Sequence, residues 1–218
     1  MLEIATFSLE DAFRAAEAGA DRIEVCKDYK TGGITPPTEW IFALNQAIQT
    51  PIVSMVRTRG GEFHYSNQEI QEIRNQGHSL KSAGTQEFIL GCLNQKSEID
   101  VSLNKSLIQD WGLPAALHRA FDECQDSFQA IDDAIESGFV RILTAKGTEN
   151  IELLEEMKKY ANGRIEIIPG GGIRSENIEE YIKIGFNTIH SSAKTGIRGK
   201  MDPGEIALLK LKLNKSRK

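Results

Sequence analysis

The chain alternates short β-rich runs with amphipathic helical stretches along its whole length. We expect strands over residues 2–6, 22–26, 52–57, 87–93, 114–118, 140–144, 164–169 and 188–191, each followed by a helix. The expected helices cover residues 9–18, 38–48, 66–82, 103–111, 127–137, 150–160 and 175–184, and a last one begins at Pro203. Strict alternation requires parallel strands joined by crossovers. Eight such units predict an α/β fold, a single (β/α)8 TIM barrel that spans residues 1–218, although ~250 residues are usual for this fold.

An open, doubly wound sheet is the alternative fold. A nucleotide-binding sheet of that type carries a glycine-rich turn after its first strand. Here Thr6, Phe7 and Ser8 stand at that turn, and none is glycine. The barrel is therefore the better prediction.

Composition excludes several classes of protein. The net charge is −5, and the only basic stretch is residues 210–218, which argues against a nucleic-acid partner. No window approaches the ~20 consecutive apolar residues of a membrane span, and the first residues lack the pattern of a signal peptide. Cys26, Cys92 and Cys124 are widely spaced and form no CxxC motif, which is typical of reduced thiols. We expect a cytoplasmic protein.

Strand parity separates core residues from site residues. Alternate residues of a barrel strand face the helices and the barrel axis. If Leu2, Ile4, Ile23 and Val25 face the helices, then Glu3 and Glu24 face inward. The same reasoning sends these further residues inward: Arg57, His118, Thr144 and His190. Most of them stand near the C-terminal ends of strands, where barrel active sites lie. For Glu3, a buried ion pair is an equally good interpretation.

Two loops are suited to binding an anion. Gly170, Gly171 and Gly172 lead from the seventh strand into a helix, and Ser191 and Ser192 follow the eighth. Glycines let backbone N–H groups approach a ligand, and these two loops form the usual phosphate site of barrels. The competing interpretation is that the glycines only make a tight turn.

Arginines accompany these loops. His118, Arg119 and Asp122 lie within five residues, and Arg57 and Arg59 precede a Gly-Gly pair. Arginine forks suit carboxylates and phosphates. Alternatively, Arg119 only clamps an acid such as Asp122 and orients the histidines.

Several of these segments resemble the CutC family of copper homeostasis proteins, and the resemblance runs from end to end. It rests on Gly-Ala-Asp-Arg-Ile-Glu-Val-Cys at 19–26, Gly-Gly-Ile-Thr-Pro at 32–36, Arg-Thr-Arg-Gly-Gly-Glu-Phe-His-Tyr-Ser at 57–66, His-Arg-Ala-Phe-Asp at 118–122, Ile-Leu-Thr at 142–144, Pro-Gly-Gly-Gly-Ile at 169–173 and His-Ser-Ser-Ala at 190–193. The chain departs from the family pattern at Thr58, where many members have proline, and at Ala145 and Lys146, where they have Ser-Gly. The extension after the eighth strand is also short, which puts the family's oligomer contacts in question.

The resemblance implies a cytoplasmic TIM barrel that forms a homodimer or a larger homo-oligomer. It also implies copper as a bound ion, with Cys26 matching a proposed copper ligand. No CxxC or Met-rich stretch supports this from the residues themselves, and an isolated inward cysteine is more often a small apolar core residue.

Three functions follow as hypotheses. The first is copper binding or handling through Cys26 and the histidines. The second is an isomerase, aldolase or lyase acting on a small, anionic molecule, including phosphorylated ones. The third is a divalent-metal site of carboxylates and histidines. The candidate acid–base residues are Glu24, His118, Asp122 and His190, and the candidate ligand-binding residues are Arg57, Arg59, Arg119, Thr144, Gly170, Gly171, Gly172, Ser191 and Ser192. A Schiff base at Lys146 is the less favoured alternative to a loop lysine.

Overall fold

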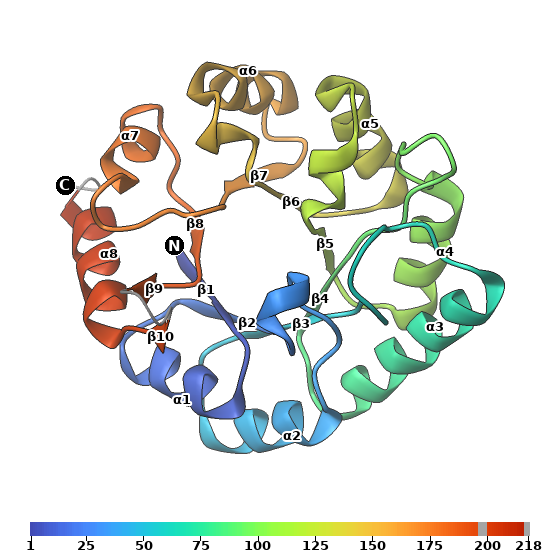
Figure 1. Ribbon diagram of the computed structural model, residues 1–218, viewed down its shortest axis with the longest axis horizontal. Helices are drawn as coiled ribbons and strands as arrows, with labels where there is room; N and C mark the ends of the chain where they lie inside the picture. The colour runs from blue at the N-terminus through green and yellow to red at the C-terminus, as the bar shows by residue number, and fades with distance from the viewer. Residues whose placement is uncertain (196–199, 216–218) are drawn as a thin grey trace.

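Eight parallel strands surrounded by helices form the protein, which we describe from a computed structural model covering residues 1–195 and 200–215 (Figure 1). The strands are β1 (Leu2–Thr6), β2 (Arg22–Val25), β3 (Ile52–Met55), β4 (Glu87–Leu90), β5 (Ala115–Leu117), β6 (Arg141–Thr144), β7 (Glu166–Pro169) and β8 (Ile189–Ser191). The helices are α1 (Leu9–Glu17), α2 (Thr38–Ala47), α3 (Asn67–Ser82), α4 (Val101–Trp111), α5 (Ser127–Ser137), α6 (Ile151–Ala161), α7 (Ile178–Lys183) and α8 (Pro203–Lys215). The predicted TIM barrel is confirmed.

The barrel is nearly closed. Hydrogen bonds join the strands in the order β7-β6-β5-β4-β3-β2-β1-β8, so β1 lies between β2 and β8. Within the described residues, no ladder joins β7 to β8. The Thr188 hydroxyl donates to Glu166 Oε1 at 2.5 Å and spans that seam with a side-chain hydrogen bond.

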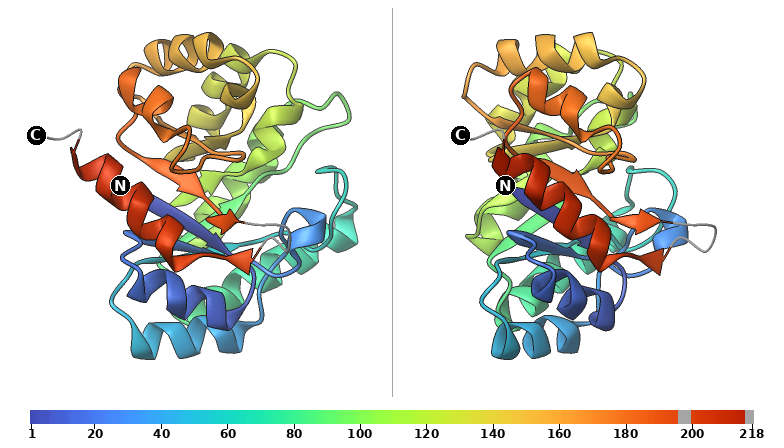
Figure 2. Two further views of the ribbon diagram at one scale, coloured as in Figure 1. Left: turned by 60° about the vertical axis from the view of Figure 1, so that its left-hand side comes forward. Right: turned by 90° about the vertical axis from the view of Figure 1, so that its left-hand side faces the viewer.

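Local sequence signals explain where several helices begin. Ser8 accepts a hydrogen bond from the Asp11 amide at the start of α1. Ser66 and Glu69 form a complete capping box at the start of α3. Pro203 is the first residue of α8, as expected, and α8 packs between α1 and α7 (Figure 2). No described helix has the length and apolar character that crossing a membrane requires.

Other elements differ from expectation. Every strand after the first is shorter than predicted, and the fourth differs most. Short 3-10 turns cover the C-terminal ends of three strands: η1 (Tyr29–Thr31), η2 (Arg119–Glu123) and η3 (Lys146–Thr148). A small hairpin of β9 (Lys194–Thr195) and β10 (Lys200–Met201) follows β8. Helix α7 begins at Ile178 instead of residue 175, and in the turn before it Glu205 of α8 binds both the Ser175 amide and its hydroxyl. Residues 216–218 of the basic tail lie outside the described residues.

Two apolar layers flank the strands. The outer one lies between strands and helices, and the inner one fills the barrel with Val53, Met55, Ile89, Ala116, Leu143 and Ile168 beside Cys26. The predicted parity of β6 is wrong: Leu143 faces the interior, and Thr144 has the opposite parity. The inward position of Arg141 sets this register, since residues two apart share a face.

Candidate functional site

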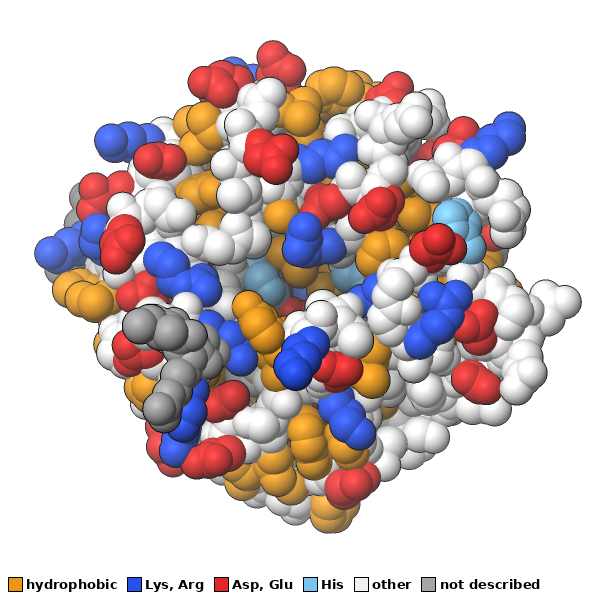
Figure 3. Space-filling view, in the orientation of Figure 1, with side chains coloured by type: hydrophobic (Ala, Val, Ile, Leu, Met, Phe, Trp, Pro, Cys, Tyr) orange, Lys and Arg blue, Asp and Glu red, His pale blue; other side chains and the backbone are white. Residues whose placement is uncertain are grey.

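A cavity of about 220 Å³ opens at the C-terminal end of the barrel. In the space-filling view it appears as a central hollow with histidine side chains at its bottom (Figure 3). Polar lining residues include Glu24, Cys26, Arg57, His118, Arg119, Gly171, Gly172, His190, Ser191 and Ser192, and apolar ones are Ala5, Phe7, Tyr29, Met55, Phe63 and Leu143. Most of the residues predicted from sequence therefore come together in one pocket.

The floor of the pocket holds an imidazole between two carboxylates. His190 Nδ1 lies 2.6 Å from Glu3 Oε1, and Nε2 lies 3.3 Å from Glu24 Oε2. On its other side, Glu3 forms a buried ion pair with Arg22. Strand pairing places these residues together, since Glu3 of β1 is in register with both Arg22 and His190.

Proton affinities at this floor differ strongly between neighbours. Burial would lower the pKa of His190, but the charges of Glu24 and Glu3 raise it above its usual value. Burial would likewise raise the pKa of Glu3, yet the hydrogen bond and charge of His190 and the charge of Arg22 lower it to about 2. Burial and the nearby Glu3 raise the pKa of Glu24. Glu3 is thus the anion of this group, whereas the proton affinities of both His190 and Glu24 are raised.

Cys26 adds a thiol to the same group. Its Sγ donates to Glu24 Oε1 at 3.4 Å. Burial and the Glu24 carboxylate raise the pKa of this thiol well above its ordinary value. Cys26 is therefore a protonated thiol that supports Glu24.

His118 is the second histidine of the pocket and is neutral. Its Nδ1 accepts a hydrogen bond from the Ala120 amide at 3.1 Å, which leaves the ring proton on Nε2. Burial and the nearby Arg57 lower the pKa of His118 to about 3. Nε2 is buried and has no protein partner. His118 thus supplies an unpaired neutral donor.

Arg57 serves mainly as a frame for the mouth. Its Nη1 donates to the carbonyls of Thr31 and Gly33 at 3.0 and 3.3 Å, and its Nη2 donates to the Gly61 carbonyl at 2.6 Å. The guanidinium also lies 4.5 Å from the ring centre of Phe63. Its Nε is buried and has no partner within the described protein.

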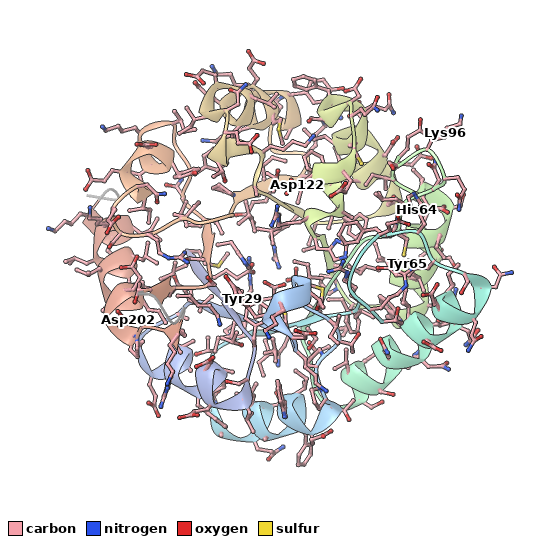
Figure 4. All side chains as sticks on the ribbon, in the orientation of Figure 1. Tyr29, His64, Tyr65, Lys96, Asp122 and Asp202 are labelled. Atoms are coloured by element: carbon pink, nitrogen blue, oxygen red, sulfur yellow. The ribbon has the colours of Figure 1, made fainter. Side chains whose placement is uncertain are left out.

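Arg119 is the more available cation. Its side chain is 60% exposed at the rim, and its Nε donates to Asp122 Oδ2 at 2.8 Å. Asp122 lies above the end of β6 (Figure 4), where it accepts hydrogen bonds from the Thr144 hydroxyl at 2.6 Å and from the Ala145 amide. Asp122 and Thr144 do not line the cavity; they bind each other and hold η2 against β6. Their predicted contact with a ligand has no support in this geometry.

Arg59 also lies outside the cavity lining. Its Nε donates to Glu69 at 2.5 Å, and its other nitrogens donate to the carbonyls of Glu62 and His64. Arg59 therefore organises the loop after β3. Strand parity places Arg57 inward, but parity does not apply to the loop residue Arg59, which is a candidate for its position beside the Gly-Gly pair.

The loops after β7 and β8 form one polar wall. Gly171 and Gly172 have φ values of +80° and +89°, and an added Cβ at Gly171 would lie 2.4 Å from Ala145 Cβ. Among the described residues, the amides of Gly171, Gly172 and Ser192 have no hydrogen-bond acceptor. Backbone donors left free in such turns are typical of anion sites. Gly170 lies just below, and its amide donates to the Thr144 carbonyl at 2.8 Å.

Arg174 fixes that wall, a role not predicted from the sequence. It donates to the hydroxyls of Ser191 and Ser192 at 3.0 and 3.2 Å and to the Lys194 carbonyl at 3.0 Å. The Ser191 hydroxyl in turn donates to the Ile173 carbonyl. In the turn that precedes α7, the Ser175 amide is not free, because Glu205 already binds it.

The residues present do not fit a resident copper centre. Within the described part of the chain, the one group of three donor residues whose ligand atoms lie within 4.8 Å of one another is Glu3, Glu24 and His190. Two carboxylates and an imidazole do not match the soft ligands that Cu(I) prefers, and both ring nitrogens already contact the carboxylates. Cys92 and Cys124 belong to the outer layer, so neither adds a second thiol.

Comparison with known proteins assigns the chain to a family. The model of the CutC family matches residues 1–195. The chain is 34% identical over 201 residues to the human copper homeostasis protein cutC homolog, covering 89% of this chain and 74% of the relative. It is 36% identical over 200 residues to a CutC family protein of Histophilus somni, covering 89% and 82%. A crystal structure of the putative copper homeostasis protein CutC from Streptococcus agalactiae superposes with a TM-score of 0.83 at 30% identity, covering 88% of this chain and 98% of that one. This barrel therefore belongs to the CutC family.

Proposed function

We propose that the mouth binds a small anionic molecule and transfers a proton to or from it, as isomerases and lyases do. The observation that carries the proposal is His190, held between Glu3 and Glu24 at the floor of a cavity. Neighbouring titratable groups with pKa values driven apart are characteristic of acid–base sites. Structural ion networks share this feature, but Glu24 also lines an open cavity.

Each group has a role in the proposal. Glu24 and His190 exchange the proton with the ligand, and Glu3 orients His190 through Nδ1. His118 Nε2–H and Arg57 Nε are buried donors that face charge developing on the ligand. The free amides of Gly171, Gly172 and Ser192 hold an acid group of the ligand, together with Arg119 at the rim.

Calorimetric titration with inorganic phosphate tests the proposal. We expect millimolar or tighter binding at pH 7, with proton uptake or release that depends on the buffer's ionisation enthalpy. The substitution E24Q should remove most of this proton exchange and leave binding in place, because the amides and Arg119 remain. Phosphate that fails to bind, or that binds without shifting the His118 and His190 imidazole resonances, would refute the proposal.

Copper handling is a second candidate, suggested by the names of the relatives. It is favoured by one observation: the sulfur-bearing side chains of Cys26 and Met55 both line the cavity. In this form of the hypothesis, Cu(I) is cargo captured at Cys26, since the site does not fit a resident ion. A Cu(I) titration against a competing chelator, with C26S as the variant, decides it. Affinity that is unchanged in C26S would exclude Cys26 as the ligand.

A cytoplasmic location and a homo-oligomeric state are further parts of the proposal. The three cysteines are free and buried, which agrees with a reducing compartment. Leu208 and Leu211 are about half exposed on α8, and such a pair would suit contact with a second copy. Light scattering measures the oligomeric state, and L208K/L211K should shift it towards the monomer.

A further inference from the structure

An aromatic sector occupies the side of the cavity formed by the loops after β1, β2 and β3. Phe7, Tyr29 and Phe63 come from these three successive loops, and all three line the cavity. The free backbone amides come from the loops after β7 and β8. The mouth thus presents aromatic rings in one sector and anion-binding groups in another.

The rings are held in defined positions. Phe7 and Tyr29 meet edge to face, with ring centres 4.9 Å apart. Lys194 Nζ lies 4.0 Å from the Tyr29 ring centre and 5.5 Å from that of Phe7, yet Lys194 does not line the cavity. The cation therefore braces this pair from the rim without filling the space inside.

Phe63 is braced in the same way on its own loop. Arg57 lies 4.5 Å from its ring centre, and the His118 ring lies 4.8 Å away. Tyr29 is 51% exposed on η1, a turn that lies over the mouth (Figure 4). About half of the Tyr29 surface is therefore free for contact with a ligand over the cavity that it lines.

The size of the cavity limits what these rings can contact. Engineered apolar cavities of about 150 Å³ bind benzene. A space of about 220 Å³ accommodates one ring of that size with a small charged substituent. Ala5, Met55 and Leu143 add an apolar part to the lining of the cavity beside Glu24 and His190.

We infer that the ligand is an aromatic or similarly planar anion of about one ring. The planar group would lie against Phe7, Tyr29 and Phe63, and its phosphate or carboxylate would bind the amides of Gly171, Gly172 and Ser192. This inference rests on the proposed function and adds the class of molecule to it.

Paired probes with the same charged group test the inference. Phenyl phosphate, methyl phosphate and inorganic phosphate are titrated into the protein by calorimetry. We expect phenyl phosphate to bind about tenfold tighter than methyl phosphate, since edge-to-face and stacked aromatic contacts add to the burial of the ring. The substitution Y29L should remove most of that preference and leave the affinity for inorganic phosphate unchanged.

A matched control uses another exposed aromatic residue. Phe42 of α2 is 59% exposed and does not line the cavity, so F42L should leave all three affinities as they are. Equal binding of phenyl and methyl phosphate, or a Y29L variant that weakens all three probes alike, would overturn the inference and leave the proposed function standing. If none of the three probes binds, both fail.

Discussion

The two ends of the barrel interior use charged residues in opposite ways. At the N-terminal end, Glu87 pairs with Arg141, and Glu3 pairs with Arg22. At the C-terminal end, His118 Nε2 and Arg57 Nε are buried without partners around an open cavity. Charges of opposite sign close the first end, where Arg22 Nη2 and Arg141 Nε are also buried without partners but neither arginine lines the cavity. At the second end, the side chains with such donors line a cavity that a ligand could fill.

His190 connects the two ends. Its Nδ1 contacts Glu3 of the paired end, and its Nε2 contacts Glu24 of the cavity floor. The paired end therefore determines the orientation and proton affinity of a side chain that faces the cavity. A barrel can build its site on its own ion network, so the structural and functional interpretations of an inward charge are compatible.

The largest effect on stability is expected from removing one partner of the Glu87–Arg141 ion pair at the N-terminal end. E87Q leaves the Arg141 guanidinium buried without its anion, which should lower the free energy of unfolding by ~3–5 kcal/mol in urea denaturation. The double variant E87Q/R141M should recover much of this loss, because no buried charge is left. The control is E155Q, which removes the partner of the exposed Lys159 and should cost below ~0.5 kcal/mol. A loss in E87Q as small as that in E155Q would contradict the comparison.

The second prediction concerns pH at the open end. The pKa of His118 is about 3 in the folded protein, against about 6.5 in an unfolded chain. The unfolded state therefore binds the extra proton first, so stability is retained above pH 6.5 and lost as the pH falls towards 3. His118 should contribute a slope of ~1.4 kcal/mol per pH unit over that range.

H118Q removes this titration and keeps a neutral hydrogen-bond donor. Urea denaturation between pH 7 and pH 4 should show the wild type losing stability faster than H118Q. The two proteins would lose stability in parallel if His118 were charged or exposed in the folded state.

How far the sequence determines this arrangement depends on the residues. The barrel follows from the alternation of strands and helices. The inward side of β1 and β2 follows from charges placed between large apolar residues, as at Glu3 and Glu24, and that of β8 follows from His190 beside Ile189. In β6 the neighbours Ile142 and Leu143 are both apolar, so their pattern does not indicate which of them faces the barrel interior. Arg141 held the missing signal, because a charge two residues before Leu143 shares its face.

Loop residues set the limit of sequence reasoning. Phe7, Tyr29, Phe63 and Arg174 follow no strand or helix period, and their positions depend on contacts with residues far along the chain. The position of Asp122 four residues after His118 predicts a place in the site, but the turn η2 directs its carboxylate towards Thr144. Sequence proximity predicted the region but not which side chains reach the cavity.

A third prediction compares two neighbouring glycines of the open end. Gly171 and Gly172 both have positive φ, but an added Cβ meets Ala145 at 2.4 Å only at Gly171 and has open space at Gly172. G172A should cost ~1 kcal/mol from backbone strain alone, and G171A ~2–4 kcal/mol from strain and overlap together. Urea denaturation measures both, and equal costs would show that the loop relaxes freely.

The smallest effect on stability, and the clearest one on binding, is expected at Arg119. Its pair with Asp122 is exposed on the arginine side, so R119Q should change the free energy of unfolding by less than ~0.5 kcal/mol. The same change removes the one cation at the rim whose Nη groups have no acceptor among the described residues, so phosphate should bind about tenfold more weakly. R59Q is the matched control, since Arg59 lies outside the cavity lining and should leave phosphate affinity unchanged. If R59Q weakened phosphate binding as much as R119Q, the anion would be responding to the net charge of the mouth. Arg119 would then not differ as a binding group from Arg59, which only organises its loop.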